Sequence, residues 1–308
     1  MERSHKILTT NGLFGMIVPL SLTCGDRMEK LRSMLEEAYT KRFYTNYEIF
    51  PSKLFDGAFQ RVTIFIGNNN SEGAFVTKLH RWYAIEREVL FSKICYTKTD
   101  TLYKKNGIAK LYTDIHRKVM EKIHDKSIIS RLLTKNPSKK MIYYQEATNY
   151  WMKACMRTPY YKKNEVVEKP AHGRFLYFSD DKSWKAVFSL LNSSIFYIYY
   201  SAFSDGFHLT DGMVKNFPFK ENLLSNTNIV SLADVLENDI KANSFITTRN
   251  TQKDKIELES FKLNASKGLL DQIDSSLAET FNFTPVELDF ILNYDIKYRM
   301  GDELSTEE

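Results

Sequence analysis

The segment from residue 139 to residue 163 interleaves cationic and aromatic side chains whose combined chemistry suits a nucleic acid. Its members include Lys139, Lys140, Tyr143, Tyr144, Tyr150, Trp151, Lys153, Arg157, Tyr160, Tyr161, Lys162 and Lys163. Cations bind phosphates, and aromatic rings stack on bases or pack against sugars. Because tyrosines also fill protein cores, the alternative is a solvated basic face with packed rings behind it. We favour the nucleic-acid interpretation and expect DNA contacts from Lys139, Lys140, Tyr143, Arg157, Lys162 and Lys163.

The distribution of charge along the chain supports this interpretation better than the overall charge of +5 does. Residues 76–163 contain 20 Lys and Arg against 7 Asp and Glu, a net charge of +13, whereas residues 221–308 contain 8 against 17, a net charge of −9. A region as basic as the first attracts a polyanion by neutralising phosphates and releasing counterions. Further cations of this region are expected to contact phosphates, namely Arg81, Lys104, Lys105, Arg117 and Lys118.

A third group of candidate contacts follows a predicted turn near residue 205. Asp205 and Gly206 form a dipeptide typical of turns, and the turn is expected to present His208 and Thr210 to a DNA groove. A histidine in that place donates to a phosphate or to a base edge, although a lone histidine is more often a hydrogen-bonded structural residue. Lys215 is expected to join this group.

The first 72 residues have the pattern of an α/β sheet. An apolar run from Leu13 to Val18 lies between two breakers, Gly12 and Pro19, and predicts a strand buried on both faces. A helix is expected from Asp26, because a glutamate follows three residues later as in a capping box and apolar residues then repeat at helical spacing. Residues 61–66 predict another strand. The region resembles the tail end of a doubly wound sheet.

The rest of the chain is expected to form two further regions. Residues 73–220 mix helical stretches with the basic aromatic segment, and residues 221–308 contain three segments with helical spacing that begin with Ser or Thr. The uncharged run from Ala186 to Ser204 has about the length of a membrane span. Its serines, tyrosines and Asn192 would need partners in lipid, so we expect a buried element and no membrane partner.

The cysteines and the N-terminus indicate a cytoplasmic protein. The three cysteines form neither a disulfide framework nor a Cys-x-x-Cys pair, which favours a reducing compartment and gives no reason to expect zinc or another metal. The N-terminal residues lack the apolar core of a secretory signal. We therefore expect cytoplasmic localisation.

Several blocks of the sequence, in order, resemble landmarks of one enzyme family. The run from Gly12 to Ser21, followed by residues 27–35, is similar to the strand and helix just after the catalytic motif of gamma-class amino-methyltransferases, as in Eco57I-like type IIG restriction-modification enzymes. Residues 55–67 are similar to the family's next conserved block. Residues 190–196, 204–208 and 216–219 resemble landmarks of its target-recognition domain, and residues 288–301 resemble its usual ending.

The resemblance implies a DNA methyltransferase architecture divided at residues 72 and 220. Residues 1–72 would be the C-terminal remnant of a Rossmann-like methyltransferase sheet, residues 73–220 a mixed α/β target-recognition domain, and residues 221–308 a helical C-terminal region. The family methylates adenine N6 with S-adenosylmethionine, which is bound by a glycine-containing loop beside an Asn-Pro-Pro-Tyr motif. Neither motif is present. The segment most similar to Asn-Pro-Pro-Tyr, from Arg157 to Tyr161, lacks the asparagine amide. We therefore expect no catalytic residue and no cofactor in this chain, with S-adenosylmethionine bound only by the complete enzyme.

Phe55 is the residue expected to lie nearest to the chemistry of the complete enzyme. Enzymes that modify a base rotate it out of the stack, and the extruded base rests against an aromatic or apolar face. The resemblance places an aromatic residue of this block there, and Phe55 suits the role better than Phe59 because it follows the loop entrance at Pro51. The alternative is a phenylalanine that only packs in the core.

Two functions follow from these observations. In the first, the chain is the recognition part of a split or truncated adenine-specific DNA methyltransferase of a restriction-modification system. It then acts on double-stranded DNA with a partner chain that carries the donor-binding segments. In the second, it is an autonomous, non-catalytic DNA-binding or regulatory module. The strand of residues 14–18 discriminates between the two functions. It would expose apolar surface and unpaired backbone unless another chain covers it, as the first function requires.

Overall fold

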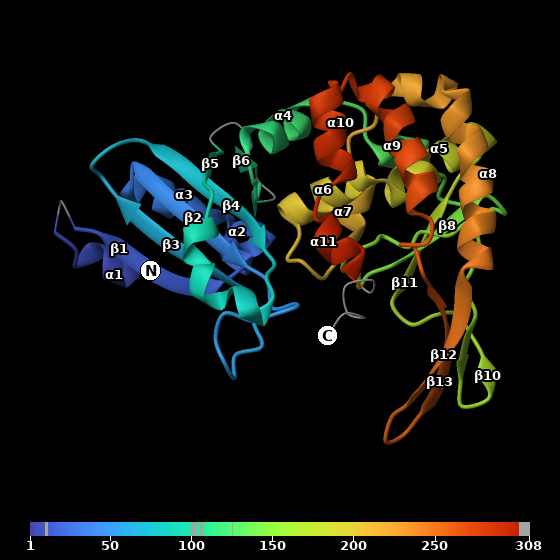
Figure 1. Ribbon diagram of the computed structural model, residues 1–308, viewed down its shortest axis with the longest axis horizontal. Coiled ribbons are helices and arrows are strands. Elements are labelled where there is room, and N and C mark those ends of the chain that lie inside the picture. The colour runs from blue at the N-terminus through green and yellow to red at the C-terminus, as the bar shows by residue number, and fades with distance from the viewer. Residues whose placement is uncertain (10–11, 100–102, 105–106, 125, 302–308) are drawn as a thin grey trace. The chain divides into compact units, whose positions relative to one another are not determined.

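The computed structural model describes residues 1–9, 12–99, 103–104, 107–124 and 126–301, without the side chains of residues 103 and 104. Helices and sheets are both present, which confirms a mixed α/β protein (Figure 1). The chain forms two compact units, which we call unit 1 (residues 1–121 with 199–206) and unit 2 (residues 122–198 with 207–308).

Unit 1 is built around a five-stranded sheet. Its elements are α1 (Glu2–Lys6), β1 (Phe14–Pro19), α2 (Ser21–Cys24), η1 (Asp26–Met28), α3 (Glu29–Ala38), β2 (Lys41–Tyr47), β3 (Val62–Asn68), β4 (Gly73–His80), η2 (Ala84–Val89), η3 (Phe91–Lys93), β5 (Thr97–Lys98), β6 (Tyr103–Lys104), β7 (Gly107–Ile108) and most of α4 (Asp114–Ile123).

Unit 2 combines packed helices with two small sheets. Its elements are η4 (Ile129–Leu132), β8 (Met141–Gln145), β9 (Tyr161–Lys163), β10 (Val166–Val167), β11 (Gly173–Tyr177), α5 (Asp181–Asn192), the first half of α6 (Ser194–Phe203), α7 (Asp211–Lys215), η5 (Glu221–Ser225), α8 (Thr227–Ala242), β12 (Ser244–Asn250), β13 (Lys255–Phe261), α9 (Lys267–Phe281), α10 (Pro285–Leu292) and α11 (Ile296–Arg299).

The large sheet of unit 1 has the strand order β1-β3-β2-β4-β5. Strand β3 is antiparallel to both β1 and β2, so β1 and β2 run parallel to each other and are joined through α3. The predicted strand at residues 61–66 and the predicted helix after Asp26 are therefore confirmed, although the helix starts with the short turn η1. Leu35 and Tyr39 cover one face of the sheet, where the Tyr39 ring stacks on Phe14 at 5.5 Å.

Strand β1 is not buried on both faces, which corrects the prediction. Phe14 is 4% exposed, but Ile17 on the opposite face is 50% exposed. The strand also lies at the edge of the sheet. The Leu20 N–H donates to the Arg61 carbonyl. In an antiparallel pair every second residue is hydrogen bonded to the partner strand, so the N–H and C=O groups of Ile17, three residues before Leu20, point away from β3. A continuous apolar run thus marks an edge strand here.

The predicted boundary after residue 72 does not separate the two compact units. Strands β3 and β4 lie on either side of it, yet both belong to the five-stranded sheet, because β2 pairs with each of them. Unit 1 continues to residue 121 and takes up residues 199–206, where the Lys110 N–H donates to the Ala202 carbonyl. Parallel pairing joins segments that are distant in sequence, so composition alone did not reveal this boundary.

The uncharged run from Ala186 to Ser204 forms parts of two helices, α5 and α6, with almost all side chains buried. Both Phe188 and Phe196 are 0% exposed. In the described ranges no helix alone has the length and hydropathy needed to cross a membrane, and the pair formed by α5 and α6 meets that criterion only when joined across a bend of 62°.

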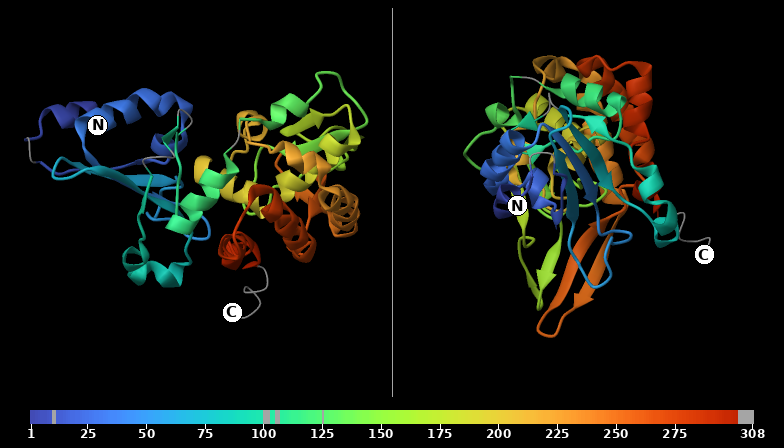
Figure 2. Two further views of the ribbon diagram at one scale, coloured as in Figure 1. Left: turned by 90° about the horizontal axis from the view of Figure 1, so that it is seen from above. Right: turned by 90° about the vertical axis from the view of Figure 1, so that its left-hand side faces the viewer.

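The C-terminal region is helical as predicted in α8, α9 and α10, but it also contains the short helix α11 and a β-hairpin, neither of which was predicted. Strands β12 and β13 pair along their whole length, and β13 also pairs with β9. The resulting four-stranded sheet, in the order β10-β9-β13-β12, projects from the helices of unit 2 (Figures 1 and 2). We call this sheet the ribbon.

Buried hydrogen bonds to Ser194 connect Asp274 with Arg299 and hold the end of the chain in the core of unit 2. The Asp274 carboxylate accepts a hydrogen bond from the Ser194 N–H at 2.9 Å, and Arg299 Nη1 donates to Ser194 Oγ at 3.0 Å. The guanidinium of Arg299 lies over the rings of Trp151 and Tyr197, with 4.0 and 4.6 Å to their centroids. The closing block of the sequence is therefore a packing element.

The stability of the protein should fall as the pH rises through the titration of Asp274. Burial raises the pKa of this carboxyl to about 6 from its usual 3.8, against the opposing hydrogen bond from Ser194 and the charge of Arg299. Between these values the folded state holds the extra proton, so the free energy of unfolding decreases by about 2 kcal/mol from pH 4 to pH 7. Denaturant titrations of the wild type and of Asp274→Asn isolate this contribution. A difference between the two proteins that does not change with pH would contradict it.

Candidate nucleic-acid interface

A loop rich in phenylalanine lies where the parallel strands β2 and β4 end. These strands end at Tyr47 and His80, and because they are parallel, their carboxyl ends share one edge of the sheet. The loop spans residues 48–61 and exposes Phe50, Phe55 and Phe59 by 40%, 40% and 68%. In α/β sheets, ligands bind at the carboxyl ends of the strands. We call residues 48–61 the phenylalanine loop.

An ion pair closes the base of the phenylalanine loop. Glu48, the first residue of the loop, contacts the Nε atom of Arg61, the last residue, and Arg81 Nη2 lies 3.6 Å from the second carboxylate oxygen. The Glu48 side chain is 0% exposed and those of Arg61 and Arg81 are 15% and 2% exposed. Arg61 Nη2 also donates to the Gly206 carbonyl at 3.4 Å. The two ends of the loop are thus held together by the ion pairs of Glu48 with Arg61 and Arg81 and by the hydrogen bond from Arg61.

The middle of the loop is anchored one residue before Phe55. The Leu54 side chain enters a hydrophobic cluster formed with Tyr47, Val62, Trp82 and Leu90. Arg87 donates to the carbonyls of Lys53 and Leu54, at 3.3 Å each, while its guanidinium lies 5.1 Å from the Trp82 ring. Phe55 therefore projects from a fixed point of the backbone with 40% of its surface exposed, which makes it accessible to a stacking partner.

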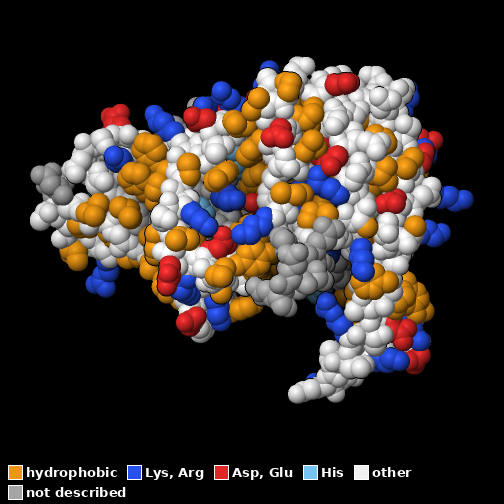
Figure 3. All heavy atoms as spheres, viewed as in Figure 1, with side chains coloured by type: hydrophobic (Ala, Val, Ile, Leu, Met, Phe, Trp, Pro, Cys, Tyr) orange, Lys and Arg blue, Asp and Glu red, His pale blue; other side chains and the backbone are white. Residues whose placement is uncertain are grey.

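The loop presents two more phenylalanines that the sequence analysis did not assign to the site. The rings of Phe50 and Phe59 meet edge to face at 5.5 Å and remain exposed. Apolar side chains gather on the visible face of this unit (Figure 3). The density of phenylalanines just before the predicted strand at residues 61–66 was the available signal, since such residues normally pack inside and an exposed cluster indicates a binding surface.

Two of the predicted DNA contacts are buried and are corrected here. Arg81 is 5% exposed and is engaged with Glu48, and Tyr143 is 3% exposed in strand β8, where it packs on Phe175 at 5.5 Å. Burial raises the pKa of Tyr143 to about 12. Neither side chain reaches a phosphate at the surface.

Arg157 is a structural residue at the base of the ribbon, which also corrects the prediction. Its two terminal nitrogens each donate to Glu259 at 2.6 Å, and its Nε lies 3.4 Å from Glu237 of helix α8. Burial alone would raise the pKa of Glu259, but hydrogen bonds from Arg157 and the Tyr160 N–H lower it below the usual value. Through Glu259 and Glu237, Arg157 fixes the ribbon to helix α8, so its guanidinium is not available to bind a phosphate.

Lys162 and Lys163 are also partly neutralised by acidic residues. Lys162 Nζ lies 2.5 Å from Glu165 and 3.8 Å from Glu257, and Lys163 Nζ lies 3.1 Å from Asp254. Glu257 and Asp254 belong to the acidic region of the sequence. The surplus of +13 in residues 76–163 is therefore compensated in part by residues 221–308, and it does not all face solvent.

Helix α4 carries the predicted phosphate contacts that remain in unit 1. Arg117 is paired with Glu121 at 2.8 Å and with Asp114 at 3.5 Å, whereas Lys118 is exposed and makes no ion pair with any described residue. Strand β6 includes the backbone of Lys104, whose side chain lies outside the described part of the chain, as does Lys105 altogether. Lys118 is thus the available cation of this helix.

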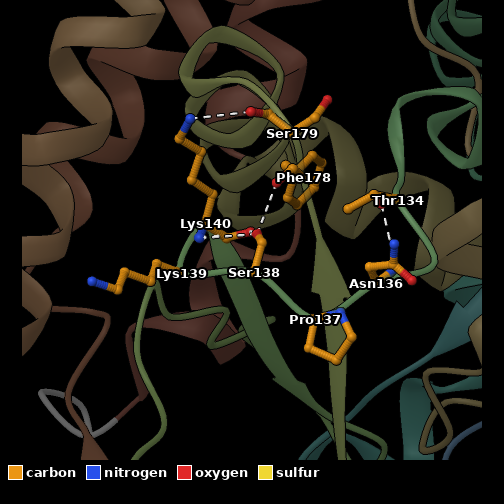
Figure 4. Close-up of a pocket in the computed structure, with 8 residues that line it drawn as sticks. All are labelled: Thr134, Asn136, Pro137, Ser138, Lys139, Lys140, Phe178 and Ser179. Carbon is orange, nitrogen blue, oxygen red and sulfur yellow. Dashed lines mark hydrogen bonds between the residues drawn. The ribbon is translucent and has the colours of Figure 1, made fainter.

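An open pocket of about 360 Å³ in unit 2 is lined by Lys139 and Lys140, whose side chains extend in different directions (Figure 4). Lys140 Nζ donates to the Ser179 carbonyl at 3.1 Å and lies 3.3 Å from Asp181, while Ser138 Oγ donates to the Phe178 carbonyl at 2.8 Å. Lys139 is exposed, and among the described residues it has no ionic partner. The polar groups of the pocket mostly satisfy one another, so Lys139 is its available anion-binding group.

The residues after the predicted turn at Asp205 are placed partly as expected. His208 is exposed and lies edge to face with Phe207, with 5.0 Å between ring centroids. Thr210, by contrast, accepts a hydrogen bond from the Met213 N–H as the N-cap of α7. Lys215 Nζ binds Asp211 at 2.5 Å. Thr210 and Lys215 therefore stabilise a short helix, although Thr210 is exposed like His208.

Comparisons with known proteins do not identify this chain. A scan against protein-family models finds no match, and a search of curated proteins finds none either. Within the described residues no three His, Cys, Asp or Glu side chains converge on a metal site.

Proposed function

We propose that this chain is the DNA-recognition part of an adenine-specific DNA N6-methyltransferase of a restriction-modification system. The phenylalanine loop carries the proposal, because it holds an exposed aromatic ring at the sheet edge where α/β proteins bind their ligands. An extruded adenine needs such a face to stack on. The resemblance of residues 12–35 and 55–67 to the methyltransferase sheet is consistent with this placement.

A further polypeptide that carries the donor-binding loop and the Asn-Pro-Pro-Tyr motif completes the proposed enzyme. Strand β1 offers the docking edge, because the backbone of Gly15 and Ile17 points away from β3 and its outer side pairs with no described residue. Leu13 and Ile17 are 67% and 50% exposed beside that edge. An added strand would satisfy the backbone and cover both side chains. S-adenosylmethionine would then bind to the completed site.

The proposal is tested by binding and activity measurements with the purified chain. It should bind duplex DNA with a slope of log affinity against log salt of about −3 to −4, if Lys118, Lys139 and one or two further cations contact phosphates. It should not bind S-adenosylmethionine in calorimetry. Co-purification with a polypeptide that supplies the missing segments should restore donor binding and yield N6-methyladenine, detected by mass spectrometry of digested DNA.

The outcomes separate the parts of the proposal. Loss of DNA binding even at low salt would refute the recognition role. Clear binding of S-adenosylmethionine by the chain alone would refute the need for a second polypeptide. A completed complex that methylates a base other than adenine would refute the assigned specificity for the N6 amine.

A further inference from the structure

The ribbon presents a polar, cationic face at some distance in sequence from the phenylalanine loop. Strands β12 and β13 are seven residues long and project from unit 2 together with β9 and β10 (Figure 2). Arg249 of β12 and the turn residues Gln252 and Lys253 are exposed. Arg, Asn and Gln are side chains that read base edges by paired hydrogen bonds.

The strand register divides the ribbon into two faces of different charge. Directly paired residues lie on the same face, so the pairing of Arg249 with Ile256, and of Ile256 with Lys163, places all three on one side. This side, which we call the Arg249 face, consists of Phe245, Thr247, Arg249, Ile256, Leu258, Ser260, Tyr161, Lys163 and Val166.

The Arg249 face has cations but no acidic strand residue. Arg249 makes no ion pair with a described residue, and Lys163 is paired only with Asp254 in the turn. Lys262 extends over the exposed ring of Phe245, with 5.5 Å between Nζ and the centroid. Hydroxyl groups of Thr247 and Ser260 are hydrogen bonded to each other at 2.8 Å, beside the cations.

The opposite face of the ribbon carries the acidic residues. Lys255, Glu257 and Glu259 follow one another on this face of β13, and the Arg157 side chain binds Glu259. Lys162 lies on this side beside Glu257, so the neighbouring cations Lys162 and Lys163 serve opposite faces. Carboxylates repel phosphates, so a polyanion approaching the ribbon is favoured only on the Arg249 face.

We propose that the Arg249 face of the ribbon enters the major groove of double-stranded DNA. This inference rests on the proposed role in DNA recognition and names the element that reads the sequence. A major groove about 12 Å wide accepts a two-stranded β-ribbon, and the β12–β13 hairpin is the part of the ribbon with that width. In such a groove Arg pairs with guanine, hydroxyls bond to base edges and apolar groups contact the thymine methyl. Lys163 and Lys262 then contact the flanking phosphates.

Cross-linking from adjacent residues of β12 tests which face meets the DNA. Phe245 and Ile246 are 45% and 53% exposed and lie on opposite faces, so they form a matched pair. Each is replaced separately by the photo-cross-linker p-benzoylphenylalanine in the full chain, which is irradiated with a mixed-sequence DNA duplex. Cross-linking from position 245 should exceed that from position 246 several-fold. Equal yields, or a higher yield from position 246, would overturn the assignment of the face.

Removal of one charge from each face tests the contact itself. Arg249→Gln should weaken binding to a duplex selected from a random library by about 5- to 150-fold and relax the preference at one base position. Lys255→Gln is the matched control, because Lys255 pairs with Asn250 one position away and lies on the opposite face.

The results distinguish the ribbon from the wider function. If the wild type binds the duplex and Arg249→Gln binds it as tightly, with the same base preference, the ribbon assignment fails and DNA recognition stands. If the wild type does not bind the duplex, both fail. Cross-linking from position 245 to a copurified protein, with none to DNA, would show that the Arg249 face binds a protein partner and would overturn the proposal.

Discussion

Replacing Arg299 by methionine is expected to lower the free energy of unfolding by about 3–5 kcal/mol at pH 7, because the buried Asp274 carboxylate then lacks the compensating charge of Arg299. Asp274 is 0% exposed and Arg299 is 3% exposed. The substitution also removes the hydrogen bond to Ser194 Oγ and the packing of the guanidinium between Trp151 and Tyr197. Denaturant titration followed by circular dichroism measures the loss.

The loss in the Arg299→Met protein should shrink as the pH is lowered toward 4. Protonation of Asp274 removes the unpaired charge, and the folded state already favours that proton because burial raises the pKa of this carboxyl. The double variant Asp274→Asn with Arg299→Met should therefore be more stable at pH 7 than Arg299→Met alone. Equal stabilities of the two proteins at pH 7 would contradict the assigned coupling between Asp274 and Arg299.

Replacing Glu48 by glutamine should destabilise unit 1 by about 2–4 kcal/mol, because two buried arginines then lose their shared anion. The pair with Arg61 closes the phenylalanine loop, so the amides of residues 49–60 should also exchange faster with solvent. Hydrogen exchange followed by mass spectrometry measures this local effect, and denaturant titration measures the global one. Unchanged exchange in the loop would show that the ion pair does not hold it.

Phe55→Ala is the matched comparison, because it removes an exposed ring and leaves the ion pair intact. It should change the free energy of unfolding little. In the completed methyltransferase it should weaken the extruded-base state by about 1–3 kcal/mol, if the ring is a stacking platform. Glu48→Gln should also reduce the rate of methylation, but it should lower the free energy of unfolding at the same time. A Phe55→Ala enzyme with the wild-type rate of methylation would remove the proposed role of this residue.

Local structure was largely determined by the sequence itself. The strand at β3 and the helices α8, α9 and α10 were predicted from apolar spacing and from capping residues such as Thr284, whose capping box with Glu287 is present. These signals act within one or two turns of chain, so neighbouring residues are enough to encode them. The hairpin β12–β13 was also within reach, since two runs rich in β-forming residues flank a short polar turn.

Exposure and pairing were decided only by the tertiary structure. The sequence shows that Arg157 is a cation in a basic segment, but its partner Glu259 is 102 residues away. It shows that Leu13 to Val18 are apolar, but their position at a sheet edge depends on the order in which β1, β3 and β2 pair. A charge is a property of one residue, whereas its solvation and its partner depend on distances in space. For that reason the sequence predicts a basic region, whereas the partners of its cations in the acidic region depend on the tertiary structure.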